Sequence, residues 1–96
     1  MEIASEFECI LNNLKKNEII NTIKISDAIK LDLYKFYKQA TEGDCNIPKP
    51  YVIYIEASAK WVAWDSIRGM SKEDAMKEYI DIYNKYISKY VDLYNT

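Results

Sequence analysis

The spacing of apolar residues along the chain predicts four helices. Apolar side chains recur every three or four residues, and only two glycines and two prolines interrupt them. We expect the first helix from Glu6 to Asn17, with Phe7 and Leu14 on one face. Ser5 and Glu8 have the spacing of a capping box, which predicts a start at this point.

The second helix is expected to begin at Ser26 or Asp27, which are good N-cap residues, and to end near Thr41. Its predicted core face consists of Ile29, Leu33, Phe36 and Ala40. Its predicted solvent face consists of Asp32, Lys35 and Gln39. The segment 17–25 fits a helical extension and an extended strand equally, so we treat it as a connection.

A long loop is expected after the second helix, because residues 42–56 carry a glycine, two prolines and turn-forming polar residues. The third helix is expected from Ala57 to Arg68, with Gly69 as the residue that ends it. Ser71 and the acidic residues after it form a second capping pattern, which opens the fourth and longest helix.

The fourth helix carries an aromatic and aliphatic stripe for about 20 residues, or roughly 30 Å. The stripe consists of Met76, Tyr79, Ile80, Tyr83, Tyr86, Ile87, Tyr90 and Tyr94. Such a stripe is typical of a core-facing side, and we predict that role for it. Tyrosine also keeps a hydroxyl for polar contacts, which leaves room for one or two residues that face a ligand.

Composition limits the chain to one soluble domain over residues 1–96, without a linker. The chain is 49% hydrophobic and 29% charged, with no apolar run long enough to cross a bilayer. The acidic start lacks the features of a secretory signal, so we expect a cytoplasmic protein without stable membrane insertion. Cys9 and Cys45 are expected to be reduced, structural thiols rather than a disulfide or a metal site.

The residue inventory argues against catalysis. The chain has no histidine, which removes the commonest general base and the usual partner of a nucleophile. Two glycines are too few for a P-loop or a dinucleotide fingerprint. A net charge of −2 argues against nucleic-acid binding. We therefore predict a protein that is not an enzyme, with no cofactor and no metal.

The stretch "YKFYKQA" has a third face besides core and solvent. At about 100° of rotation per residue, Tyr34 and Lys38 share a sector with Leu31 and Thr41, and Tyr37 lies at its border with the core. Phenol rings, an ammonium group and an aliphatic chain together suit a nucleotide joined to a hydrocarbon. The alternative is an amphipathic helix whose tyrosines cover the core edge and whose lysine is solvated. Spacing alone does not decide between them.

A second cluster lies in the third helix, where Lys60 precedes Trp64 by one turn and Trp61 lies three residues before Trp64. Lys60 is a candidate phosphate ligand beside an indole ring. We predict that both tryptophans are core anchors with their N–H groups satisfied at the rim.

Several motifs in order resemble the acyl-CoA-binding protein family. They are "YKFYKQATEGDCN", the proline at position 50, "AKWVAW" and "GMSKEDAMKEYI". The resemblance covers about residues 31–82 and extends more loosely through Phe7 and Leu14 of the first helix. It implies an all-α four-helix bundle that holds a long-chain fatty acyl-CoA ester and carries and pools it without catalysis, as a cytoplasmic monomer.

The resemblance also assigns roles to individual residues. The Y-x-x-Y-K motif of the family falls on Tyr34, Tyr37 and Lys38, which implies contacts to the adenine and the ribose 3′-phosphate. The lysine of K-W-x-x-W falls on Lys60, a further phosphate ligand, and the tyrosine after "KEDAMKE" falls on Tyr79. Further contacts, aligned less firmly, are Leu31, Asp27 and Lys15, with Lys16 beside them.

The chain departs from the family at several positions. Glu56 and Ser58 stand where lysines are common, which weakens the expected attraction for phosphates. Tyr51 follows Pro50 where glycine is usual, so the loop is expected to take another path. The first connection is about four residues longer, which affects the placement of Lys15. The alternative function is a helical protein-interaction module that docks through the tyrosine-rich fourth helix.

Overall fold

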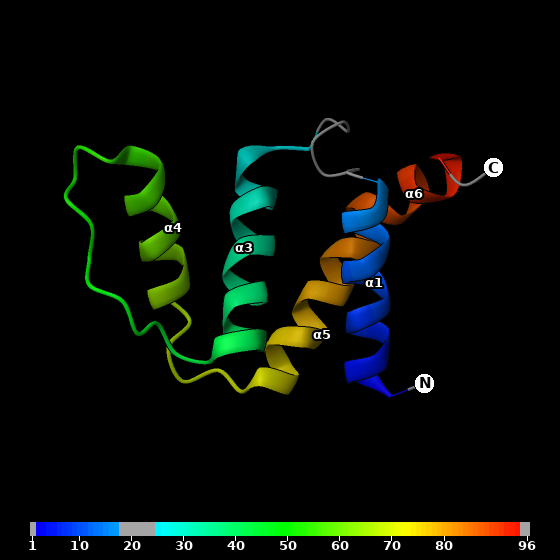
Figure 1. Cartoon of the computed structure of the whole chain (residues 1–96), viewed down its shortest axis with the longest axis horizontal. Helices are drawn as coiled ribbons and strands as arrows, with labels where there is room; N and C mark the ends of the chain where they lie inside the picture. The colour runs from blue at the N-terminus through cyan, green and yellow to red at the C-terminus, as the bar shows by residue number, and fades with distance from the viewer. Residues whose placement is uncertain (1, 18–24, 95–96) are drawn as a thin grey trace.

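The computed structural model describes residues 2–17 and 25–94, and these form helices without a strand (Figure 1). The elements are α1 (Ile3–Asn17), α3 (Asp27–Glu42), α4 (Ile55–Asp65), α5 (Lys72–Ile82), the π-helical turn η1 (Tyr83–Ile87) and α6 (Ser88–Tyr94). The last three form one continuous run. The predicted all-α four-helix architecture is confirmed. Most of the predicted connection 17–25 lies outside the described residues.

The helices pack in a chain of neighbours rather than around one axis. α5 packs against both α1 and α3, and α4 packs against the other side of α3. Figure 1 shows α4 at one edge of the molecule, with the loop that precedes it running along its outer side. The result is an elongated shape of 44 × 30 × 19 Å.

The core lies between α1, α3 and the run from α5 to α6. Its most buried members are Phe7, Ile10, Leu14, Leu33, Phe36, Ala40, Ala75, Tyr79, Ile80, Tyr83, Ile87 and Val91. The predicted core face of the second helix is therefore confirmed at Leu33, Phe36 and Ala40, and Ile29 packs against the same cluster. Gln39 was predicted to face solvent, which is wrong. It is 1% exposed, because its amide Nε2 donates to Asp44 Oδ1 and to the carbonyl of Met70.

Helix boundaries differ from the predicted ones at three places. α1 begins at Ile3, so the predicted cap Ser5 lies inside the helix, where Ile3 packs on the core. α4 begins two residues before Ala57 and ends at Asp65, three residues before the predicted end. The chain then makes tighter turns, in which Ile67 N–H donates to Trp64 and Arg68 N–H to Asp65. Gly69, with φ of 95°, closes this turn rather than the helix itself.

The caps at Ser26 and Ser71 are confirmed. The Ser26 hydroxyl accepts from Ile29 N–H at 3.2 Å, and the Ser71 hydroxyl accepts from Asp74 N–H at 3.0 Å. Gly43 follows α3 with φ of 83°, a conformation that a residue with a side chain rarely adopts. These caps fix where α3 and α5 begin, and therefore where their side chains point.

The aromatic stripe of the last helix is confirmed only in part. Tyr79, Tyr83 and Ile87 are buried, as predicted. Tyr86, which belongs to the predicted stripe, is 36% exposed, and Val91, which does not belong to it, is buried. The reason is η1, where Ser88 N–H bonds to the Tyr83 carbonyl five residues back. Tyr86 lies within this wider turn, which points its side chain out of the core, and the helix after the turn is rotated so that Val91 is buried. The side chain of Tyr94 lies outside the described residues.

The two tryptophans have different roles. Trp64 is fully buried, as predicted, and its indole N–H donates to the Gly43 carbonyl at 2.8 Å. Trp61 was predicted to be a core anchor, which is wrong, because it is only half-buried and lies outside the core cluster. Its N–H donates to the carbonyl of Ile47 in the long loop. Cys9 and Cys45 are both free thiols, as predicted.

Candidate ligand-binding site

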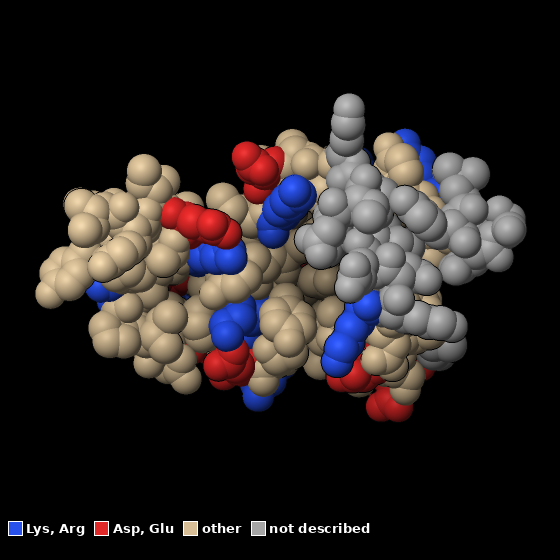
Figure 2. Space-filling model, turned by 45° about the horizontal axis from the view of Figure 1, so that its top comes forward, with Lys and Arg blue, Asp and Glu red and all other residues tan. Residues whose placement is uncertain are grey.

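A cleft of about 1110 Å³ is lined by residues from the end of α1, from α3, from the start of α4 and from α5. Figure 2 shows basic side chains, with acidic ones beside them, on the hollowed face between α4 and α3. Its lining consists of Leu14, Lys15, Asp27, Lys30, Leu31, Leu33, Tyr34, Tyr37, Ile55, Glu56, Ala59, Lys60 and Tyr79. The volume exceeds the roughly 300–1,000 Å³ usual for small-ligand sites, so a long ligand fits it.

The lining combines three kinds of group. Aliphatic side chains come from each of α1, α3 and α4, and three tyrosines come from α3 and α5. Three lysines face two carboxylates, those of Asp27 and Glu56. A site of this kind can shield a hydrocarbon, stack on an aromatic base and bind an anion within one continuous space.

Lys60 and Tyr34 meet across the boundary between α4 and α3. The Lys60 ammonium lies 5.4 Å from the centre of the Tyr34 ring, within the range of a cation–π interaction. The same ammonium is 3.2 Å from Glu56 Oε1. Two residues predicted from separate motifs therefore lie together, and a carboxylate holds the lysine in the absence of an anion.

Lys38 does not line the cleft. It forms an ion pair and hydrogen bond with Glu42, one turn later in α3, and its ammonium lies 4.9 Å from the centre of a Trp64 ring. The hydrogen bond to Glu42 raises the pKa of Lys38, so the side chain stays charged. Lys38 follows Tyr34 by one helical turn, and to reach an anion in the cleft it has to release Glu42.

Tyr79 forms the inner wall of the cleft from α5. It is 6% exposed, and its ring packs edge-on against Phe7 at 5.3 Å between centroids. Burial raises the pKa of its phenol to about 12, with smaller contributions from nearby Tyr37 and Tyr83. Tyr79 thus joins the core and the cleft, while Tyr37, which is 38% exposed, forms the outer rim.

The less firmly aligned residues Leu31, Asp27 and Lys15 also line the cleft, at the ends of α3 and α1. The side chain of Lys16 lies outside the described residues. Lys30 and Ile55 were not predicted, although both line the same space. The helical period could have found Lys30, because it precedes Tyr34 by one turn. Ile55 follows an irregular loop, where no period applies.

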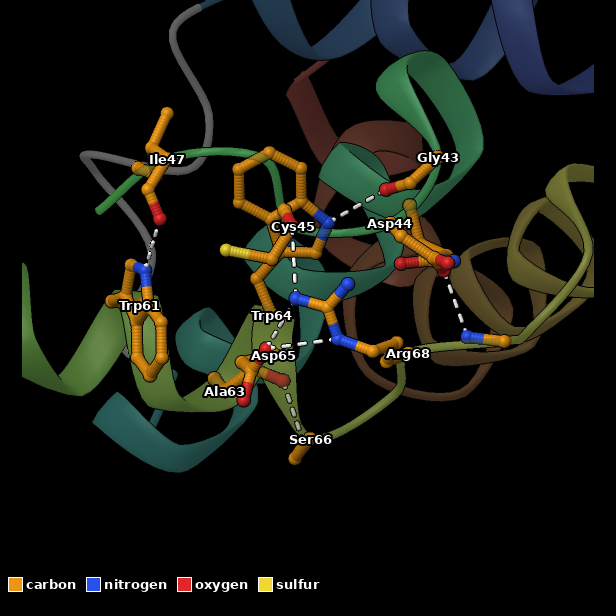
Figure 3. Close-up of polar contacts among 12 residues, drawn as sticks. Gly43, Asp44, Cys45, Ile47, Trp61, Ala63, Trp64, Asp65, Ser66 and Arg68 are labelled. Atoms are coloured by element: carbon orange, nitrogen blue, oxygen red, sulfur yellow. Dashed lines mark hydrogen bonds and ion pairs between the residues drawn. The ribbon is translucent and has the colours of Figure 1, made fainter. Parts of the chain in front are cut away.

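The loop after α3 fixes the position of α4 and therefore of Lys60. Figure 3 shows three side chains of or just after α4 that donate to carbonyls of this loop. Trp64 reaches Gly43, Trp61 reaches Ile47, and Arg68 reaches Cys45, each at 2.8 or 2.9 Å. These bonds join α4 to the start of the loop, so the wall that carries Lys60 is held at a set distance from α3.

Asp44 connects the same loop to the turn before α5. Its Oδ1 accepts from Gly69 N–H at 2.7 Å and from the Gln39 amide at 2.9 Å. The Gly69 bond is the main reason that the pKa of Asp44 lies below its usual value, followed by the Gln39 bond. α3, the loop and the start of α5 are therefore joined at the end of the molecule opposite the cleft.

Fold and cleft define a small helical binding protein whose site suits an amphiphile with an aromatic and anionic head. Residues 4–83 match the model of a protein family described as "Acyl CoA binding protein". The chain therefore belongs to the acyl-CoA-binding protein family.

Individual relatives agree with this family. The acyl-CoA-binding protein of Dictyostelium discoideum is 46% identical over 69 residues, which cover 72% of this chain and 82% of the relative. The crystal structure of Oryza sativa acyl-CoA-binding protein 2 superposes with a TM-score of 0.74 at 33% identity, covering 92% of this chain and 93% of that one. Human enoyl-CoA delta isomerase 2 is 50% identical over 54 residues, which cover 56% of this chain but only 14% of the enzyme.

Proposed function

We propose that this protein binds long-chain fatty acyl-CoA esters and acts as an intracellular carrier and pool former for them. The observation that carries the proposal is one cleft in which aliphatic walls, the Tyr34 ring and the Lys60 ammonium are continuous. An acyl-CoA ester has the same three parts: a hydrocarbon, an adenine ring and phosphates. The family assignment supports the same ligand.

The hydrocarbon contributes most of the binding free energy. Burying a methylene group stabilises a complex by about 0.8 kcal/mol, so some fifteen of them supply up to about 12 kcal/mol before ordering costs. Charge-assisted hydrogen bonds from Lys60 and Lys38 add about 1.5–3 kcal/mol each, and stacking on a tyrosine adds about 1–3 kcal/mol. The head contacts therefore select acyl-CoA over free fatty acid.

In this proposal the nucleotide head lies against Tyr34 and Tyr37, with phosphates between Lys60 and Lys38 after Glu56 and Glu42 have been displaced. The acyl chain runs along Leu31 and the inner wall that Tyr79 provides. Lys15 and Asp27 form the outer margin.

We also propose that the domain, residues 1–96, works as a cytoplasmic monomer without catalysis. The chain contains no histidine, and its cleft is lined by no serine, threonine or cysteine among the described residues. The homologous part of the isomerase is a small fraction of that enzyme, so the similarity does not extend an isomerase activity to this chain. None of the described helices is long and apolar enough to cross a membrane.

The alternative, docking through the tyrosine-rich last helix, has less support. Tyr79 and Tyr83 are buried in the core, so the stripe is not available as one continuous face.

Titration calorimetry with a long-chain acyl-CoA, CoA and the matching fatty acid tests the proposal. We expect the ester to bind at least about a hundredfold more tightly than either part, because only the ester uses both the apolar walls and the lysines. Equal affinities for all three ligands would contradict it. A series of acyl lengths would then show how much of the cleft the chain fills.

A further inference from the structure

Five consecutive apolar side chains stand exposed where the long loop enters α4. They are Tyr51, Val52, Ile53, Tyr54 and Ile55, with exposed fractions from 58% to 80%, and we name them the apolar tip. Single exposed apolar residues are ordinary, but a contiguous exposed group of this kind marks an interaction site. The proposed ligand site does not account for it, because only Ile55 also lines the cleft.

The apolar tip has a formed backbone. Tyr54 N–H donates to the Tyr51 carbonyl at 3.0 Å, which makes a turn with Val52 and Ile53 at its corners. Ser58 in α4 holds this turn twice, since its hydroxyl donates to the Tyr51 carbonyl and its N–H to the Tyr54 carbonyl. The two aliphatic side chains at the corners are thus presented outward by a braced turn, and they need little further ordering to bind.

The position of the apolar tip links it to the mouth of the cleft. Ile55 belongs to both, and the cleft opens at the same ends of α1, α3 and α4. Figure 1 shows the loop at the outer edge of the molecule, beyond α4, where neighbouring helices do not cover it. Between Lys49 and Glu56 the chain has no charged residue, and Lys49 precedes the apolar tip by two residues.

We propose that the apolar tip docks this protein reversibly on the surface of a phospholipid bilayer, with Val52 and Ile53 inserted below the headgroups. The choice of a bilayer rests on the proposed function, because a long-chain acyl ester partitions into membranes and has to be taken from them or returned to them. Tyrosines beside the two aliphatic residues suit the boundary between headgroups and hydrocarbon. Lys49, two residues before Tyr51, supplies a positive charge for the phosphates of the lipid headgroups.

A second copy of the chain fits this feature less well. Stable interfaces involve roughly 20–30 residues on each partner, whereas the apolar tip consists of residues 51–55 alone. A bilayer requires no matching groove.

The test is vesicle flotation with the full chain, using phosphatidylcholine vesicles with and without phosphatidylglycerol. We expect the wild type to float with both kinds, and more strongly with the anionic one. Val52→Asp/Ile53→Asp should lower the partition coefficient at least about tenfold, because two aliphatic groups can no longer be buried. Val62→Asp is the matched control, since Val62 is an exposed valine of α4 outside the apolar tip.

Two further measurements separate this proposal from the ligand proposal. Calorimetry with dissolved acyl-CoA, without vesicles, should give the same affinity for the wild type and for Val52→Asp/Ile53→Asp. If the variant loses this affinity instead, the apolar tip covers the bound ligand and the docking proposal is wrong. A wild type that does not float, or a self-association that Val52→Asp/Ile53→Asp abolishes, would also overturn docking while leaving the acyl-CoA site intact.

Discussion

At the scale of single residues, each lysine proposed for the phosphates is held by a carboxylate four residues away in its own helix. Lys38 pairs with Glu42, and Lys60 pairs with Glu56. Exposed pairs of this kind contribute only about 0.3–0.5 kcal/mol, so a ligand phosphate can displace the carboxylate at small cost. The carboxylates nevertheless lower the local positive potential that an anion meets.

The Lys38 pair gives a direct prediction for binding. Lys38→Ala should weaken acyl-CoA binding about tenfold or more, because a charge-assisted hydrogen bond is lost. Glu42→Gln should strengthen binding several-fold at low salt, because Lys38 no longer has a competing anion. Glu73→Gln makes the same charge change on α5, where Glu73 pairs with Lys77, and should leave the affinity unchanged. If Lys38→Ala left both affinity and salt dependence unaltered, Lys38 would have no role in the site.

Tyr79 gives a prediction for the pH dependence of stability. Its pKa is about 12 in the folded protein against 10.0 for an unperturbed phenol, so the unfolded chain loses this proton first as pH rises. The stabilisation is complete below pH 10 and is lost as pH rises towards 12. The shift corresponds to about 2–3 kcal/mol of the free energy of unfolding.

Urea unfolding at several pH values across this range measures the effect. Tyr79→Phe should flatten the fall in stability relative to the wild type, whereas Tyr86→Phe, at an exposed position, should follow the wild type. Parallel curves for the wild type and Tyr79→Phe would show that the buried phenol does not control this pH range.

At the scale of elements, η1 determines which face of the last helix enters the core. The buried positions Ala75, Tyr79, Tyr83, Ile87 and Val91 follow one another at intervals of four. An α-helix has 3.6 residues per turn, so such a series would drift around the helix. One wider turn compensates for the drift and keeps the buried positions on the core side of the run.

This geometry predicts a large effect at a position that the α-helical period does not single out. Val91→Ala should lower the free energy of unfolding by about 2 kcal/mol, because two buried methyl groups are lost and a cavity remains. Val62→Ala makes the same change at an exposed site and should cost less than about 0.5 kcal/mol. Equal costs measured by urea unfolding would mean that Val91 is not in the core.

At the scale of the whole molecule, the cleft exists only because separate helices meet. Its lining comes from α1, α3, α4 and α5, and α4 packs mainly on α3. In the core, each helix packs mainly on its neighbour, α4 on α3, α3 on α5 and α5 on α1. A ligand in the cleft contacts all four helices at once. Binding and global stability should be coupled.

Unfolding in the presence of ligand tests this coupling. Long-chain acyl-CoA at about 1,000 times its Kd should raise the free energy of unfolding by about 4 kcal/mol. The same concentration of CoA alone should raise the free energy of unfolding far less, because CoA lacks the acyl group that packs against the apolar walls. An equally large rise with CoA would mean that the nucleotide head, and not the acyl group, provides most of the binding free energy.

Much of the fold could be predicted from local signals. Ser26 and Ser71 mark helix starts because their hydroxyls satisfy backbone groups within one turn, which is a property of a few neighbouring residues. Ser5 has the same capping pattern, but the prediction of a helix start there is wrong, because the helix extends back to Ile3, which packs on the core. The prediction that Tyr86 is buried is wrong because a regular α-helical period takes no account of a π turn.

The candidate site divides in the same way. Helical spacing and family motifs selected Tyr34, Tyr37, Lys60 and Tyr79, and the structure places all four on one cleft. The burial of Gln39 against Met70 and the meeting of Lys60 with Tyr34 depend on contacts between distant segments. Such contacts leave no periodic signal in the sequence.

The sequence by itself determined the helical class, the capped starts of α3 and α5, the family, and the residue types able to hold an acyl-CoA. These depend on interactions within a turn or on motifs that are read directly. Only the tertiary structure decided that Lys38 is paired with Glu42, that Val91 replaces Tyr86 in the core, and that residues 51–55 stand exposed beside the cleft. The Lys38 pair lies within one helical turn, where the spacing permits a partner but does not select it. The burial of Val91 and the exposure of residues 51–55 follow from how the helices pack against one another, where neighbours in space are far apart in the chain.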